Sequence, residues 1–176
     1  MKSFNKNMEY RDLLENIASM FEINTYVEIG ILAGETLKKI APHVNRAIGV
    51  DKNLRIKSEG NIELYEMKSE DFIKQWHEPI DMLFIDGDHS EDNVFQDLSG
   101  LFNWVVPETG LIFLHDTFPI KPELLSKDRS GDAWKVARKV HLFWKQDCEI
   151  VTLPGPWGGI SILRKLRNGK HGWMEV

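Results

Sequence analysis

Short apolar runs alternate with helical segments along most of this chain, and that alternation restricts its fold more than any other feature. The runs that fit strands are Thr25–Ile29, Ala47–Val50, Ile62–Met67, Met82–Ile85 and Leu111–Leu114. Each is short and rich in residues that pack well on a pleated sheet. Because neighbouring parallel strands need a connection of about a dozen residues, the intervening helices predict a parallel sheet with right-handed crossovers.

The segments between these runs show helical periodicity. Apolar residues recur at helical spacing before the first run, which predicts an N-terminal helix over about residues 8–21. Further helices are expected at Thr36–Ala41, Ser69–Trp76, Ser90–Phe102 and Ala133–Trp144. Ser90 has the residue type and position of a helix N-cap.

The end of the chain breaks the alternation. Only residues 154–158 separate Glu149–Leu153 from Gly159–Arg164, which is too short for a crossover, so these two runs are expected to form an antiparallel hairpin at the sheet edge. The sequence therefore predicts a doubly wound, Rossmann-like α/β fold. Its sheet would have seven strands, mostly parallel, with an antiparallel C-terminal hairpin.

Length and composition narrow the function classes. A chain of 176 residues without an internal repeat is expected to form a single domain, residues 1–176, ending in a polar tail over 166–176. No apolar stretch approaches the ~20 residues of a membrane span, so a cytoplasmic location is expected. A net charge of -5 makes nucleic acid an unfavourable partner, and the lone Cys148 excludes a disulfide within the chain.

The turn after the first run carries an acid and two glycines. Glu28 precedes Gly30 and Gly34, whereas a dinucleotide-binding turn would have a glycine where Leu32 stands. An NAD-dependent oxidoreductase is therefore the least favoured enzyme class. A carboxylate at this turn instead suits a ligand that carries an ammonium and a sulfonium.

Polar residues also end the second and third runs. Asp51 is placed to accept hydrogen bonds from ribose hydroxyls, and Ser69 and Glu70 are placed to contact an adenine edge. The structural alternatives stay open at this point: Asp51 as a turn former and Ser69 as a helix N-cap.

From about Thr25 to Lys165 the chain resembles the class I S-adenosylmethionine-dependent methyltransferases. The turn from Glu28 to Thr36 looks like the family's acidic glycine motif. The phrases Phe84–Ser90 (FIDGDHS) and Gly110–Thr117 (ending HDT) are similar to a branch of small-molecule O-methyltransferases that includes antibiotic-sugar enzymes. The resemblance implies S-adenosylmethionine as cofactor, with the following binding residues: Glu28, Gly30, Gly34, Thr36, Asp51, Ser69, Glu70 and Asp86.

Acids and histidines follow the fourth and fifth runs. Asp86, Asp88 and His89 follow one, His115 and Asp116 follow the other, and all five are expected to converge at one edge of the sheet. Methyl transfer needs little more than alignment of the acceptor, proton removal and exclusion of water.

The resemblance also suggests roles for these groups. In catechol and caffeoyl-CoA type O-methyltransferases a carboxylate at the Asp86 position and an Asp-Asn pair hold a divalent cation, and a lysine base lies three residues beyond the first ligand. In this chain His89 stands at the position of the lysine base, and the resemblance implies that His89 and Asp86 are catalytic. His115 and Asp116 stand where those enzymes have the Asp-Asn pair. A metal set of Asp86, His115 and Asp116 is implied for magnesium or manganese, with imidazole favouring manganese, iron or zinc.

Structural roles compete with these. The structural alternative for Asp86 is to accept backbone N–H bonds at a helix start, and that for His115 is to hold its loop. Residues 117–131 contain two prolines and no clear periodicity, which predicts either a lid or an inert connection. With so little extra architecture, part of the acceptor pocket is expected from a second subunit of a homo-oligomer.

The leading hypothesis is thus methylation of a hydroxyl on a sugar or another small molecule. An N-methyltransferase or nucleic-acid methyltransferase is the second enzyme hypothesis, although the fourth run is followed by no Asn-Pro-Pro-Tyr motif. A cofactor-binding regulatory or scaffold domain without turnover is the third.

Overall fold

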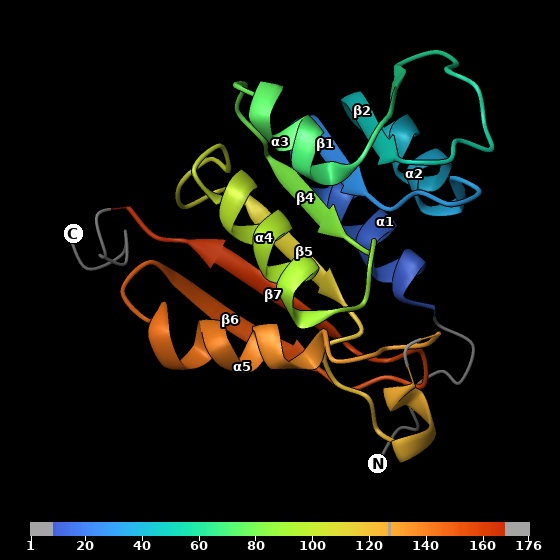
Figure 1. Ribbon diagram of the computed structural model, residues 1–176. Helices are drawn as coiled ribbons and strands as arrows, with labels where there is room; N and C mark the ends of the chain where they lie inside the picture. Colours follow the sequence, from blue (N-terminus) through green and yellow to red (C-terminus); the bar gives the residue numbers. More distant parts are fainter. Residues whose placement is uncertain (1–8, 127, 168–176) are drawn as a thin grey trace.

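The computed structural model describes residues 9–126 and 128–167, and the predicted α/β architecture is confirmed within them (Figure 1). One seven-stranded sheet has the order β3-β2-β1-β4-β5-β7-β6. The strands β1 to β5 pair in parallel, and β7 is antiparallel to both β5 and β6. The C-terminal hairpin therefore forms one end of the sheet, as predicted.

The elements begin and end within three residues of the predicted bounds. The strands are β1 Ile23–Ile29, β2 Val44–Asp51, β3 Ile62–Glu66, β4 Met82–Ile85, β5 Leu111–His115, β6 Cys148–Leu153 and β7 Ile160–Lys165. The helices are α1 Tyr10–Met20, α2 Glu35–Ile40, α3 Ser69–Gln75, α4 Glu91–Phe102 and α5 Trp134–Phe143, with short 3-10 turns at Ala41–His43 and Pro122–Leu125.

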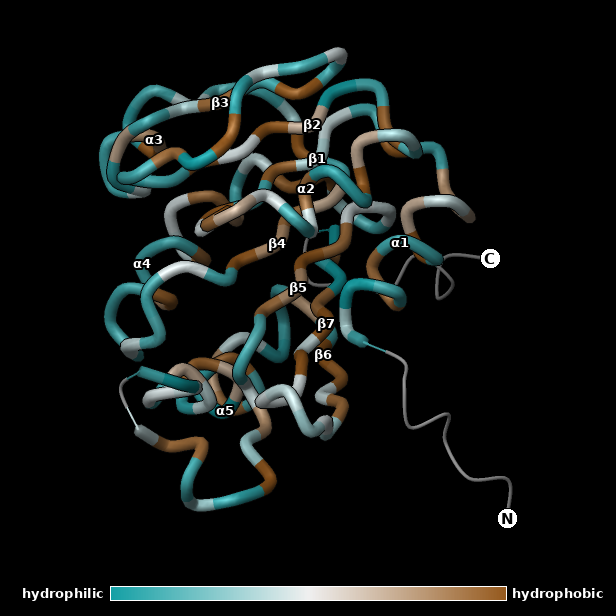
Figure 2. The backbone as a smooth tube through the Cα atoms, turned by 90° about the vertical axis from the view of Figure 1, so that its right-hand side faces the viewer, coloured by the Kyte–Doolittle hydropathy of each residue, from teal (hydrophilic) through white to brown (hydrophobic). Residues whose placement is uncertain are grey.

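The helices cover both faces of the sheet. Leu14 of α1 and Leu37 of α2 are fully buried in the core on one face. Phe72 of α3, Leu98 of α4 and Val136 of α5 are fully buried in the core on the other. Hydrophobic residues concentrate along the central strands between these layers (Figure 2). Burial of both faces explains why the strands read as nearly continuous apolar runs.

Some predicted segments are only partly described. Of the predicted polar tail, residues 168–176 lie outside the described ranges, while Leu166 is buried and its N–H donates to the Asp147 carbonyl at 2.8 Å. The predicted lid over 117–131 contains the Pro122–Leu125 turn, and its motion stays a prediction. No helix in the described ranges has the length and apolar character needed to cross a membrane.

Candidate active site

The register of the parallel strands brings their carboxyl ends to one edge of the sheet. Ile29 of β1 pairs with Val50 of β2 and with Ile85 of β4. Ile85 in turn pairs with Leu114 of β5. The residues that follow these strands therefore lie side by side, as the sequence predicts.

The turn after β1 packs directly against the turn after β4. Gly30 has a φ of +85°, and a Cβ built on it would lie 2.4 Å from the Asp86 carbonyl oxygen and from the Gly87 Cα. No side chain fits in that space, and residues other than glycine rarely adopt this φ, so the position requires glycine. The predicted cofactor turn and the predicted catalytic turn are thus in backbone contact.

The rest of the β1–α2 turn is strained and open. Leu32 adopts a φ of +47° although it is not glycine, and its side chain is exposed. Gly34 lies at the N-cap of α2 with a φ of +69°, and Thr36 is buried in the first turn of that helix. Such strain is costly and gathers at sites where backbone meets ligand.

Glu28 is a buried acid beneath this turn. Its side chain is 2% exposed and accepts a hydrogen bond from the Tyr26 hydroxyl at 2.7 Å. Burial raises its pKa to about 8, and the bond from Tyr26 opposes that rise. An ionised form would need a cation, and a ligand ammonium would supply one.

Asp51 ends β2 and ties two turns together. Its carboxylate accepts from the Leu32 N–H at 3.0 Å and from the Asn53 N–H at 2.9 Å. The turn-forming role considered from the sequence is therefore present. Asp51 is also partly exposed beside the β1–α2 turn, so its carboxylate is accessible to a ribose.

Ser69 and Glu70 occupy the first turn of α3. Lys68 is the N-cap residue, so the alternative of Ser69 as N-cap is wrong. Both side chains are partly exposed, and Glu70 lies 3.4 Å from the Lys68 ammonium. Ser69 is free of the capping role and remains available to a ligand.

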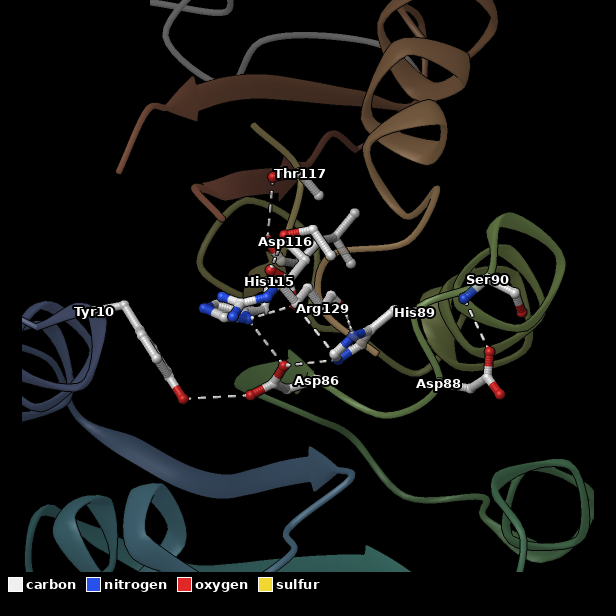
Figure 3. Close-up of polar contacts among 11 residues, drawn as sticks. Tyr10, Asp86, Asp88, His89, Ser90, His115, Asp116, Thr117 and Arg129 are labelled. Carbon is white, nitrogen blue, oxygen red and sulfur yellow. Dashed lines mark hydrogen bonds and ion pairs between the residues drawn. The ribbon is translucent and has the colours of Figure 1, made fainter. Parts of the chain in front are cut away.

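Two acids and two histidines converge beyond β4 and β5 (Figure 3). His115 Nδ1 lies 3.0 Å from Asp86 Oδ1 and 3.1 Å from Asp116 Oδ2. His89 Nε2 lies 3.4 Å from Asp116 Oδ2 and 3.9 Å from Asp86 Oδ1. Four of the five polar residues that were predicted to converge at this edge therefore do so.

Asp88 is the exception. The sequence placed it in the same cluster, but its carboxylate accepts from the Ser90 N–H at 2.9 Å and faces the start of α4 (Figure 3). Ser90 caps that helix by accepting from the Asn93 N–H, as predicted. Asp88 thus has the helix-start role that was considered for Asp86, whose carboxylate lies against His115 instead.

The cluster is electrostatically paired. Burial alone would lower the pKa of His115, but the Asp86 and Asp116 carboxylates raise it to about 9. Burial acts in the opposite sense on Asp116, and its bond to His115 nevertheless lowers the pKa of that carboxyl. Without a bound cation, His115 therefore carries positive charge at neutral pH between two acids, and a metal bound at its Nδ1 would displace that proton.

Three partners of the cluster were not predicted. Tyr10 of α1 donates its hydroxyl to Asp86 Oδ2 at 3.4 Å, and Ser130 donates to Asp116 Oδ1 at 2.6 Å. His89 Nδ1 contacts the Arg129 carbonyl oxygen (Figure 3). Tyr10 shares the helical stripe of α1, so periodicity marks it only as core. The other two come from the 117–131 segment, which borders the site.

The donor set fits a divalent cation. One atom each from Asp86, His115 and Asp116 lies within 4.8 Å of the others, giving two oxygens and one nitrogen. Asp116 holds its place with a φ of +59°, a strained conformation that aspartate tolerates better than most residues. His115 Nε2 is buried without a hydrogen-bond partner among the described residues.

A family model described as a methyltransferase domain matches residues 27–117, from within β1 to just beyond β5, and this range includes every acid discussed above. The chain belongs to this methyltransferase family. No curated protein sequence matches it significantly.

Solved structures share the fold of this methyltransferase at low identity. The SAH-bound methyltransferase PaMTH1 of Podospora anserina is 13% identical, with a TM-score of 0.70, and the match covers 93% of this chain and 81% of that one. An O-methyltransferase of Bacillus cereus in complex with SAH is 16% identical, with a TM-score of 0.64 over 92% and 84% of the two chains. The N-methyltransferase NodS of Bradyrhizobium japonicum is 15% identical, with a TM-score of 0.61 over 90% and 96%.

Proposed function

We propose that this methyltransferase transfers a methyl group from S-adenosylmethionine to a hydroxyl of a sugar or another small molecule. The observation that carries the proposal is the backbone contact between Gly30 and the Asp86-Gly87 turn. A ligand lying on the first turn would present its reactive end to the acids of the second. S-adenosylmethionine supplies a methyl group that its sulfonium makes electrophilic.

The residues of the β1–β3 side would bind the cofactor. Glu28 would accept its ammonium, since this buried carboxyl has no cation partner within 4 Å in the described ranges. Asp51 would accept hydrogen bonds from the ribose, and Ser69 and Glu70 would contact the adenine. Gly30, Gly34 and Thr36 would shape the turn on which the ligand lies.

His89 would act as the base. A backbone carbonyl only accepts hydrogen bonds, so the Arg129 carbonyl would hold the proton on Nδ1 and leave the Nε2 lone pair for the acceptor hydroxyl. The carboxylates of Asp116 and Asp86, 3.4 and 3.9 Å from Nε2, would stabilise the imidazolium that forms when the acceptor hydroxyl loses its proton. Tyr10 would hold Asp86 in place.

A His89→Ala variant tests this base. We expect kcat to fall about 10²–10⁴-fold, the range typical of general base catalysis, while the affinity for S-adenosylhomocysteine stays unchanged. His141→Ala, at an exposed position of α5, is the matched control and should keep full activity. Turnover would be followed as S-adenosylhomocysteine formed from a panel of hydroxylated small molecules. Wild-type turnover by His89→Ala would remove the proposed base.

We further propose that Asp86, His115 and Asp116 hold a divalent cation, which would orient the acceptor oxygen and lower its pKa. The mixed oxygen and nitrogen donors favour manganese over magnesium. Calorimetry with Mn²⁺ should show binding to the wild type and at least tenfold weaker binding to Asp116→Asn, because a charged ligand is lost. Equal affinities, or full activity after exhaustive chelation, would contradict the metal proposal.

An N-methyltransferase shares this fold, so the assay is designed to distinguish oxygen acceptors from nitrogen acceptors. The acceptor panel therefore includes amines and an RNA oligonucleotide. Conversion of amines alone would replace the O-methyltransferase proposal with the N-methyltransferase alternative. S-adenosylhomocysteine binding without turnover on any acceptor would favour the scaffold alternative. The cytoplasmic location and the second subunit stay predictions.

A further inference from the structure

The two carboxylate oxygens of Asp116 have different surroundings. Oδ2 faces the imidazoles of His115 and His89, at 3.1 and 3.4 Å. Oδ1 accepts a hydrogen bond from the Ser130 hydroxyl at 2.6 Å, and both of these residues are buried. A buried carboxylate that accepts such a bond on one oxygen is held in one orientation. Oδ2 is therefore the oxygen that this orientation presents to the site.

The loop between β6 and β7 closes the space around Asp116 Oδ1. Gly158 of this loop has a φ of +95°, and a Cβ built on it would lie 1.9 Å from Asp116 Oδ1 and 2.7 Å from Ser130 Oγ. The Gly158 carbonyl oxygen accepts from the Phe118 N–H at 2.7 Å, which ties the loop to the segment that follows β5. The carboxylate thus has little room to turn on that side, and Ser130 supplies the donor that fixes it.

The neighbours of Ser130 in the chain hold His89. The Arg129 carbonyl oxygen contacts His89 Nδ1 (Figure 3), and the Asp132 N–H donates to the His89 carbonyl at 3.1 Å. Gly131, with a φ of +51°, packs so closely that a Cβ on it would lie 2.5 Å from that carbonyl oxygen. Four consecutive residues therefore bridge the turns after β4 and β5, and the side chain of Ser130 is bonded to a candidate metal ligand.

We propose that Ser130 is a positioning residue that sets Asp116 to bind a divalent cation through Oδ2 alone. This inference rests on the proposed function, which assigns Asp116 to the cation. With Oδ1 engaged, Oδ2 stays beside the imidazole of His115, which is another of the candidate ligands. Hydrogen bonds to ligating carboxylates orient them, and removing such a bond typically costs about 10–100-fold in metal affinity.

Calorimetry with Mn²⁺ tests this role without knowledge of the acceptor. Ser130→Ala should bind Mn²⁺ about tenfold more weakly than the wild type, because its Asp116 carboxylate is no longer fixed. Ser130→Cys replaces the hydroxyl by a thiol of similar shape that donates a weaker hydrogen bond, so its Mn²⁺ affinity should lie between the two. Both variants should bind S-adenosylhomocysteine as the wild type does, since Ser130 is not among the proposed cofactor-binding residues.

Two controls separate positioning from damage to the fold. Ser161→Ala removes a similarly buried hydroxyl, which is bonded to the hydroxyls of Thr117 and Thr152 at 2.8 Å, and should leave Mn²⁺ binding unchanged. In an Asp116→Ala background, Ser130→Ala should have no further effect on Mn²⁺ binding, because the carboxylate through which it acts is absent. The unfolding curve of each variant checks that it is folded.

The outcomes are distinguishable. If the wild type does not bind S-adenosylhomocysteine, the proposed function fails. If it binds S-adenosylhomocysteine but not Mn²⁺, the metal site and the role of Ser130 are both overturned while the methyltransferase function stands. If folded Ser130→Ala binds Mn²⁺ as tightly as the wild type, only the role of Ser130 is overturned. Equal losses of Mn²⁺ affinity in Ser130→Ala and Ser161→Ala would also overturn it, since a general structural effect would then explain the result.

Discussion

Individual acids in this molecule differ in function because their surroundings differ. Asp86 and Asp88 are two residues apart, yet one faces two imidazoles and the other faces the N–H groups of a helix start. The sequence identified both as candidates from their place after a strand. Which of them points into the site depends on the path of the turn, and no periodic pattern encodes that path.

The pH dependence of stability should reveal Glu28. Its pKa is raised by burial from about 4.5 to about 8, so between these pH values the unfolded state binds fewer protons and stability falls as pH rises. One such group contributes a slope of at most about 1.4 kcal/mol per pH unit. Glu28→Gln should flatten the decline measured by urea unfolding between pH 5.5 and 8.

The control for Glu28 is Glu63→Gln, at a partly exposed position on β3. The pKa of Glu63 is lowered, chiefly by its hydrogen bond with Arg46, so its contribution is lost only toward acid pH. This variant should keep the wild-type decline above pH 5.5. Parallel profiles for the wild type and Glu28→Gln would show that Glu28 does not hold a proton in the folded state.

Among the elements, the β1–α2 turn is the one whose geometry matters most to the site. Gly30 needs both its φ of +85° and the absence of a Cβ, whereas Gly60 has a φ of +60° with nothing within 4 Å of a built Cβ. The two positions separate backbone strain from steric conflict. A left-handed conformation alone costs roughly 1–2 kcal/mol for a residue with a side chain.

We therefore expect Gly60→Ala to lose about 1 kcal/mol of unfolding free energy and to bind S-adenosylhomocysteine normally. Gly30→Ala should lose several times more and bind the ligand poorly, because the turns after β1 and β4 must move apart. Chemical unfolding and calorimetry measure both effects. Equal losses in the two variants would mean that the contact between these turns does not constrain the site.

At the scale of the whole molecule, the sequence predicted the arrangement of the strands and helices better than the contacts between distant residues. The order of apolar runs and helices was enough to predict a doubly wound sheet with all the candidate acids at one edge, because parallel strands share a direction. The contacts between distant segments could not be predicted from that order. Tyr10 reaches Asp86 across 76 positions in the chain. Its ring occupies an apolar position in the helical pattern of α1, and only the fold determines where its hydroxyl points.

Asp97 is a second residue whose position the sequence shows and whose surroundings it does not. An acid at a core position of α4 interrupts the stripe formed by Val94, Leu98 and Leu101, and that interruption was visible in the sequence. The burial of that carboxyl was not, because it depends on how α4 packs in the fold.

The central claim is that one edge of the sheet binds a nucleoside sulfonium with its reactive carbon facing Asp86 and His89. A crystal structure of the complex with S-adenosylhomocysteine tests it most directly. We predict electron density across the ends of β1, β2 and β4, with the ribose at Asp51, the amino group at Glu28 and the sulfur toward His89. Density at any other place on the sheet, or none at saturating ligand, would contradict the account.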